Sequence, residues 1–466
     1  IGYETGKGGT SGTPYSSGQY NVAVGANALD AFTTGDNNIA IGKNAFGALT
    51  SANNNIAIGQ GAGDIVTTGA ANILIGSDAG GSITTDQYVT IVGYSSGQYM
   101  EAGNGNRYNS YFGATAGYRG GPGIHQTYIG GEAGMYATGS YNTFVGSQTG
   151  RGGQTSAPYS SGEYNTALGY EALEDFTSGA HNVAIGYQAA AALTTGAENV
   201  ALGTTTLNAL TTGGTNTALG VRAGLVLTEG DSNTFVGKDA GDSATLINEA
   251  VLIGHNAGHT ISTSTAVDGT VGIGAEVLAG LTTGAGNTAV GYDALGDITT
   301  GGLNTVLGYE AGSKLGAGES QNVIIGYEAM ADADEGTGSG NEIDNNIAIG
   351  YQSLTMADFG STGSRVAKRI IAIGSYALNS TGTNSNTGTI AIGYEALTSL
   401  TSGGGNLALG YQAGAGVTTG TYNHFLGHEA GKVHTTGNRN IAIGQNAMDD
   451  TDAGSTSLGS NDNIFM

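Results

Sequence analysis

Four glutamates that each follow a tyrosine are the residues in this sequence that most resemble catalytic carboxylates. They are Glu171, Glu310, Glu328 and Glu395, which follow Tyr170, Tyr309, Tyr327 and Tyr394. Two carboxylates in one cleft can act as general acid and general base. All four occupy the same position of one repeated phrase, however, and this favours a solvated face over an active site. Because no Ser-His-Asp or Cys-His set stands out from the repeat either, we predict no catalytic residues and no enzyme activity.

Histidines and acidic residues raise the question of metal binding. His424 and His428 are the most suggestive of the seven histidines, since three copies of His424 around an axis could hold a metal ion or an anion. A neutral, packed histidine is the favoured interpretation. Polar pairs near turns, Asp36-Asn37 and Asp231-Ser232, lack the dense acidic spacing of a calcium loop, so turn capping by their side chains is favoured. We expect no metal and no cofactor.

A tyrosine-rich stretch is the first candidate contact surface. The segment 94–141 contains eight of the 24 tyrosines together with two arginines. Tyrosine and arginine are favoured at recognition surfaces, and tyrosine rings also pack on sugars. The candidate contact residues in this stretch are Tyr99, Arg107, Tyr108, Tyr118 and Arg119. The alternative is that the tyrosines simply fill equivalent positions of stacked turns.

Two long intervals of the repeat provide the second candidate surface. Gly326, Gly350 and Gly374 are separated by 24 residues each, seven more than the common interval. Loops on a rigid scaffold are natural contact sites. One interval contains Asp332, Asp334 and Glu335, and the other contains Arg365, Lys368 and Arg369. The basic group is a candidate contact site, and packing between oppositely charged neighbouring loops is the equally favoured alternative.

The element that positions all these residues is a short repeat. The phrase Asn-x-Ala-x-Gly or a near copy ends at 25 glycines between Gly2 and Gly444, and 15 of the 24 intervals are as long as that from Gly186 to Gly203. A constant period over hundreds of residues is typical of a solenoid. In one copy, residues 182–186 alternate with period two and are predicted to form a strand, while 187–190 are predicted as a second short strand. Parallel stacking of turns would place the asparagines in ladders of hydrogen-bonded amides.

The two faces of the strand differ in character. In the copy at 38–42, Asn38 and Ala40 lie on one face, and Ile39 and Ile41 lie on the other. The small face suits the interior of a narrow roll, which leaves an aliphatic stripe outside that is too large for a monomer. We therefore predict association about an axis parallel to the fibre. The alternative reverses the faces and keeps the aliphatic side chains inside a monomeric roll.

Composition excludes several classes of protein. The 466 residues include 87 glycines but only 3 prolines, without the period of three that collagen requires. A formal charge of −24, from 13 basic and 37 acidic residues, disfavours nucleic acid as a partner. The longest apolar runs fall short of the roughly 18 residues of a membrane span, so we expect no membrane insertion. Threonine pairs such as Thr194-Thr195 raise the question of ice binding, but adjacent side chains point in opposite directions along a strand.

A longer repeat is superimposed on the short one. Residues 1–21 align with 145–165 at an offset of 144, as expected for growth by duplication, which solenoids tolerate because each turn touches only its neighbours. We divide the chain into 1–144, 145–325, a segment with longer loops at 326–393, and 394–466. Both ends lie inside a repeat phrase, and we expect the sequence to be a fragment of a longer protein.

The phrase Asn-Ile-Ala-Ile-Gly at 55–59 and 346–350 resembles the head repeats of trimeric YadA-like autotransporter adhesins. The phrase at 165–173, followed by Thr-Ser-Gly at 177–179, is similar to repeats of phage and bacterial tail-fibre-like proteins. The resemblance covers nearly the whole chain, although the common turn is longer here than is usual for the adhesin heads. It implies an all-β, left-handed parallel β-roll with three chains around one axis.

On this basis we expect a non-catalytic, extracellular attachment segment of a phage tail fibre or a cell-surface appendage. Its partners would be two further copies of itself and a glycan or protein receptor on a host surface. A trimeric autotransporter adhesin head is the alternative, and a polysaccharide-acting fibre enzyme or an ice-binding solenoid is less favoured.

Overall fold

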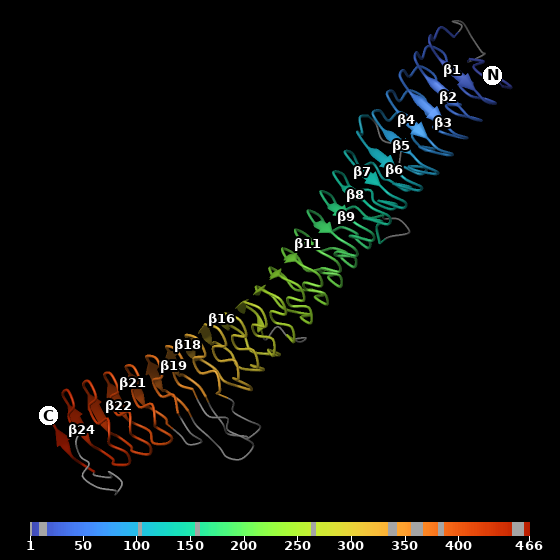
Figure 1. The fold of residues 1–466 in the computed structure, drawn as a ribbon. Coiled ribbons are helices and arrows are strands. Elements are labelled where there is room, and N and C mark those ends of the chain that lie inside the picture. The colour runs from blue at the N-terminus through green and yellow to red at the C-terminus, as the bar shows by residue number, and fades with distance from the viewer. Residues whose placement is uncertain are drawn as a thin grey trace. The chain divides into compact units, whose positions relative to one another are not determined.

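The computed structural model describes residues 2–8, 16–100, 105–153, 159–261, 267–333, 343–355, 367–380, 386–449 and 461–466. The chain forms two compact units, Ile1–Ser232 and Asn233–Met466, and each is a stack of turns (Figure 1). The described residues contain β-strands and turns but no α-helix. Arg365, Asp334 and Glu335 lie outside the described residues.

Each turn contributes one very short strand to a parallel sheet. The strands of the first unit are β1 Val22–Val24, β2 Ile39–Ile41, β3 Ile56–Ile58, β4 Ile73–Ile75, β5 Thr90–Val92, β6 Ser110–Phe112, β7 Thr127–Ile129, β8 Thr143–Val145, β9 Thr166–Leu168, β10 Val183–Ile185, β11 Val200–Leu202 and β12 Thr217–Leu219. Those of the second unit are β13 Thr234–Val236, β14 Val251–Ile253, β15 Val271–Ile273, β16 Thr288–Val290, β17 Thr305–Leu307, β18 Val323–Ile325, β19 Ile347–Ile349, β20 Ile371–Ile373, β21 Ile390–Ile392, β22 Leu407–Leu409, β23 His424–Leu426, β24 Ile441–Ile443 and β25 Ile464–Phe465. The predicted all-β parallel solenoid, with one turn for each copy of the repeat, is confirmed.

The register of the strands follows the repeat. Val183 pairs with Val200 and Ala184 with Ala201, so each side chain lies over its equivalent in the next turn. The long intervals keep this register, because Val323 still pairs with Ile347 across one of them. A slip by one residue would exchange the two faces of the strand. The extra residues of a long interval therefore leave the faces of the sheet unchanged.

The prediction of a second strand at 187–190 is wrong. Gln188 and Ala190 have φ values of 51° and 49°, in the left-handed region, so this stretch folds into successive turns. Neighbouring turns hold this conformation, since the Gln188 N–H donates to the Tyr170 carbonyl and the Ala190 N–H donates to the Thr206 carbonyl, both at 2.9 Å. We call this part of each turn the return side. Like the strand, the return side forms backbone hydrogen bonds with the neighbouring turns, but its residues do not have strand φ values.

The glycine that closes each strand is required by close contact between turns. Gly186 has a φ of 137°, and a Cβ atom there would collide with the carbonyl oxygen of Gly203 in the next turn. Glycine alone combines this φ with the absence of a side chain. The repeat glycine therefore permits the tight stacking on which the fold depends.

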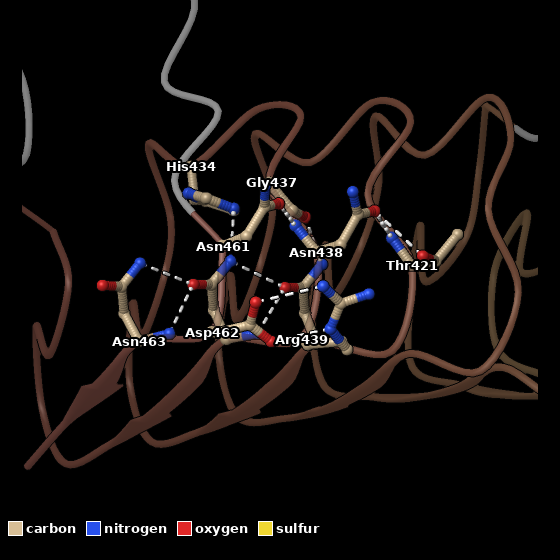
Figure 2. Close-up of polar contacts among 10 residues, drawn as sticks. Thr421, His434, Gly437, Asn438, Arg439, Asn461, Asp462 and Asn463 are labelled. Atoms are coloured by element: carbon tan, nitrogen blue, oxygen red, sulfur yellow. Dashed lines mark hydrogen bonds and ion pairs between the residues drawn. The ribbon is translucent and has the colours of Figure 1, made fainter.

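Buried asparagines form the ladder that the repeat predicts. The Asn199 side-chain amide donates to Asn182 Oδ1 at 3.1 Å and to the Gly213 carbonyl at 2.9 Å. Asn199 Oδ1 in turn accepts from the backbone N–H of Asn216 at 3.0 Å. Figure 2 shows the same arrangement near the end of the second unit, where the Asn463 amide donates to Asn440 Oδ1 at 2.9 Å. Asn199 thus bonds the asparagine side chain of the preceding turn and satisfies backbone groups on the side of the following turn.

Replacing Asn199 with Ala should destabilise the first unit. The change leaves buried backbone and amide groups without partners, and each such group costs about 1–3 kcal/mol. We expect a lower urea midpoint and faster hydrogen exchange at β10, β11 and β12. Thr195→Ala, at an exposed position of the same turn, is the control and should leave both measurements unchanged. Equal midpoints for the Asn199 variant and the parent would show that the ladder does not stabilise the stack.

The interior of each unit is filled by the inward face of the strand and by the return side. Ala40 and Asn38 are fully buried, whereas Ile41 is 38% exposed, so the predicted assignment of the two strand faces is confirmed. Some turns place larger groups in the same interior position. Tyr111, Tyr128 and Phe144 are fully buried and stack on one another with ring centroids 5.0 and 5.1 Å apart.

Candidate functional site

In each unit, the outward strand face carries an apolar column, formed by the third residue of each strand. Its members in the first unit include Val24, Ile41, Ile58, Phe112, Ile129, Leu168 and Leu202, which are 37–47% exposed. The second unit continues the pattern with Ile273, Leu307, Leu409 and Ile443. We refer to these residues as the apolar column. A contiguous exposed apolar surface of this length is typical of an association surface.

An aromatic ladder of six rings runs through the first unit, each ring belonging to a residue that stands two positions before a strand. Its members are Tyr88, Tyr108, His125, Tyr141, Tyr164 and His181. Successive ring centroids are 4.8–5.3 Å apart and the rings are within 14° of parallel. Because each ring face rests on its neighbour, Tyr108 presents only an edge to solvent. Tyr108 therefore fills a position of the ladder and offers no free ring face to a sugar.

Arg107 is not a surface residue, contrary to the sequence prediction. Its side chain is 2% exposed, and Nε donates to Asp86 Oδ1 at 2.5 Å. Nη1 donates to the Gly121 carbonyl at 2.8 Å. A buried charge of this kind persists only when it is paired and hydrogen-bonded. No sequence pattern indicated the pair, because Asp86 lies 21 residues earlier and stands where the previous turn has Gly69.

Tyr99, Tyr118 and Arg119 come together on the return side, where they meet Tyr136 and Tyr159; we call these five residues the Tyr–Arg cluster. The Arg119 guanidinium lies 5.1, 5.8 and 5.7 Å from the ring centroids of Tyr99, Tyr118 and Tyr159. Its Nη1 also donates to the Tyr159 hydroxyl at 3.0 Å. Each contact of a guanidinium with an aromatic ring contributes about 0.5–1 kcal/mol at an exposed site.

Backbone hydrogen bonds between turns set the positions of the cluster. The Tyr99 N–H donates to the Tyr118 carbonyl, and the Arg119 N–H donates to the Met135 carbonyl, both at 2.8 Å. The rings of Tyr136 and Tyr159 stack with centroids 6.1 Å apart. Sequence reasoning missed Tyr159, which is 40 residues from Arg119. The available signal was its place in the Tyr-Ser-Ser-Gly phrase that also occurs at 15–18.

The phenol of Tyr118 remains a hydrogen-bond donor at neutral pH. Partial burial raises the pKa of Tyr118, and the neighbouring Tyr99 raises it further, whereas Arg119 opposes the shift. The rings of Tyr99 and Tyr118 are nearly perpendicular, at 85° with centroids 5.0 Å apart. The cluster therefore presents ring surface, phenol hydroxyls and one guanidinium within a few ångströms of one another.

The second predicted contact group belongs to the second unit. The Lys368 ammonium lies 3.5 Å from the Asp344 carboxylate, and the Arg369 N–H donates to the Asp344 carbonyl at 3.3 Å. These contacts join two successive turns of the second unit. Lys368 thus participates in packing between turns, which was one of the two alternatives for this group.

The repeated glutamates also interact between turns. The carboxylates of Glu171, Glu328 and Glu395 accept hydrogen bonds at 2.5–2.6 Å from glutamine amides one turn later. The donors are Gln188, Gln352 and Gln412. Each of these three carboxylates therefore bonds an amide of the next turn.

Turn capping accounts for the acidic residues considered as calcium ligands. Asp36 Oδ1 accepts from the Gln19 N–H at 2.6 Å, and Asp231 Oδ1 accepts from the Gly214 N–H at 2.7 Å. His424 lies exposed on β23, and His428 stacks on Tyr411 with centroids 4.9 Å apart. Throughout the described ranges, no group of three or more His, Cys, Asp or Glu side chains is arranged to hold a metal ion.

His434 is a titratable group within the apolar interior of the second unit. Its side chain is fully buried at the position that Leu400 and Val417 occupy in earlier turns. Its Nε2 lies 3.2 Å from the Asn440 amide nitrogen, which is a donor, so this ring nitrogen accepts (Figure 2). Burial lowers the pKa of His434 from its ordinary value of 6.5, and a backbone hydrogen bond at Gly437 opposes this only in part.

The turns around His434 should lose stability in acid. A base with a lowered pKa in the folded state stabilises the fold fully above its unfolded pKa, near 6.5, and progressively less as the pH falls below it. We expect hydrogen-exchange protection of β23 and β24, corrected for intrinsic rates, to fall between pH 7.5 and pH 5. His434→Leu should remove this pH dependence, whereas His428→Leu, a change at an exposed histidine, should retain it. Equal pH dependence in the His434 variant and the parent would contradict the assignment.

Comparison with models of protein families found no match, and comparison with curated proteins found none either. Within the described part of the chain there is also no helix long and apolar enough to cross a bilayer. The functional interpretation therefore depends on the geometry of the apolar column and the Tyr–Arg cluster.

Proposed function

We propose that this chain is a non-catalytic structural and adhesive fibre segment, of a phage tail fibre or a cell-surface appendage, that acts as a homotrimer. The observation that carries the proposal is the apolar column, which recurs on the strand face in turn after turn. Burying one such aliphatic side chain completely contributes about 1.5–3 kcal/mol. Because the column has one such side chain in every turn, even partial burial of each side chain adds up to a strong preference for association.

Three chains suit this surface better than two. Each chain presents a narrow apolar stripe along the stack, and a central axis gathers three narrow stripes so that each is covered from both sides. The parallel register supports this arrangement, because identical turns of three chains then lie at the same height along the axis.

An attachment role is supported by the two kinds of surface that each unit presents. The strand face is apolar, whereas the return side of the first unit carries the Tyr–Arg cluster. Association through the strand face leaves the return side facing outwards. Catalysis of polysaccharide cleavage is disfavoured, since three of the four repeated glutamates are hydrogen-bonded to glutamine amides of the next turn.

The test combines mass, adhesion and turnover. Light scattering should give a mass about three times the 46.1 kDa of one chain. The labelled protein should be retained on bacterial envelope preparations or on animal cells, and the preferred surface distinguishes a tail fibre from an adhesin head. No polysaccharide incubated with the protein should be shortened. A folded monomer that is retained on neither surface, or glycan cleavage abolished by one carboxylate substitution, would refute the proposal.

A further inference from the structure

We propose that the Tyr–Arg cluster binds a carboxylated sugar, whose carboxylate pairs with Arg119 while its ring packs against the tyrosines. This inference rests on the proposed attachment function and names the chemistry of the surface group that is recognised. The carboxylated sugar can be a uronic acid within a polysaccharide or a terminal sialic acid. The two sources share the same negatively charged group beside a pyranose ring.

The guanidinium of Arg119 has more N–H donors than its neighbours in the cluster use. A guanidinium has five N–H donors in a planar fork, and its match to a carboxylate is bidentate. Nη1 donates to the Tyr159 hydroxyl, and the other contacts of the group are with ring faces, which do not use its in-plane donors. The side chain is only partly buried. Three rings hold the fork in place, and an edge of it remains for an incoming carboxylate.

The positive charge of Arg119 has no carboxylate close to it in the described part of the chain. Several other basic residues pair with carboxylates: Arg151 lies 3.4 Å from Glu132 and 3.3 Å from Glu174, and Arg439 lies 2.6 Å from Asp462. Among the residues that the structure describes, no carboxylate lies within ion-pair distance of Arg119. Exposed charges beyond about 8 Å are screened at physiological salt, so the overall charge of −24 weakens a contact at this site only slightly.

The rings of Tyr99 and Tyr118 form an aromatic surface whose shape suits a sugar ring. Tyr99 is 46% exposed and stands nearly perpendicular to Tyr118, so the pair forms a corner of one ring face and one ring edge. The aromatic ladder lacks this feature, because the faces of its inner rings are covered by neighbouring rings. Tyrosine also supplies a large contact area with little loss of side-chain entropy. The phenol hydroxyls of the corner can bond the hydroxyls of a sugar.

The test measures binding of two acidic probes, each with a neutral counterpart. Oligogalacturonate is compared with its methyl ester, and sialyllactose is compared with lactose, by calorimetry or glycan array. The parent should bind at least one acidic probe about tenfold or more tightly than its neutral counterpart. The probe that binds identifies the source as a uronic or a sialic acid. Failure of both acidic probes, or equal binding of charged and neutral forms, would overturn the proposal without the use of any variant.

Variants locate the site. Arg119→Gln should weaken acidic binding by about tenfold or more, and Arg119→Lys should weaken it less, since it keeps the charge but loses the planar fork. Lys43→Gln makes the same change in net charge at an exposed residue outside the Tyr–Arg cluster and should have no effect. Unchanged affinity in Arg119→Gln would assign the binding elsewhere. If the parent is trimeric and is retained on cells but binds neither acidic probe, only the sugar-binding proposal is refuted. If the parent is a monomer that is not retained on cells, the proposed attachment function is refuted as well.

Discussion

Simultaneous replacement of Ile41, Ile58 and Ile75 with Asp should dissociate the proposed trimer into single chains. These residues occupy one position of β2, β3 and β4, which pair in parallel register, so the three new carboxylates would lie over one another. In the proposed trimer they would also face their copies in the other chains. An unpaired charge in such a poorly hydrated interface costs several kcal/mol. The expected result is a fall in mass, measured by light scattering, from about three chains to one.

The control adds the same charge on the return side of the first unit. Ala31, Ala48 and Ile65 lie in successive turns, are at least partly exposed, and do not belong to the apolar column. The variant with Asp at these three positions should keep the parental mass. If the Ile41, Ile58 and Ile75 variant stays trimeric, or the parent is already a monomer, the apolar column is not the interface.

Replacing Arg107 with Met should strongly destabilise the turns around β5 and β6. The substitution removes the cation from a fully buried pair and leaves the Asp86 carboxylate in the interior, where Nε had donated to it at 2.5 Å. Loss of one partner from a buried pair costs about 3–5 kcal/mol. We expect a lower urea midpoint, loss of hydrogen-exchange protection at β5 and β6, and cleavage by protease in this region.

A double variant separates the role of charge from the role of packing. When Arg107→Met is combined with Asp86→Ala, no unpaired charge remains, and replacement of a buried pair by apolar groups is often neutral or stabilising. An earlier turn already accommodates Ala52 at the position that Asp86 occupies. The double variant should therefore recover most of the lost stability. A single variant as stable as the parent would show that Asp86 does not require its partner.

The repeat was sufficient to predict the architecture of each unit and the faces of its strands. The constant period requires equivalent residues to lie over one another, and the alternation at 38–42 places Asn38 and Ala40 inside because they are the small residues. The amide ladder is a consequence of this stacking, because asparagines buried at the equivalent position of successive turns are each other's nearest polar partners. The apolar column was predictable for the same reason.

Tertiary contacts decided the return side and the candidate site. Gln188 and Ala190 have no intrinsic preference for positive φ, and they adopt it because hydrogen bonds to the turns on either side hold them there. The direction of a long side chain also depends on its partners in other turns. Arg107 points inwards because Asp86 of an earlier turn pairs with it, whereas Arg119 points to the surface because tyrosines up to 40 residues away surround it. These two arginines of one tyrosine-rich stretch thus differ in role, and only the stacking of turns distinguishes them.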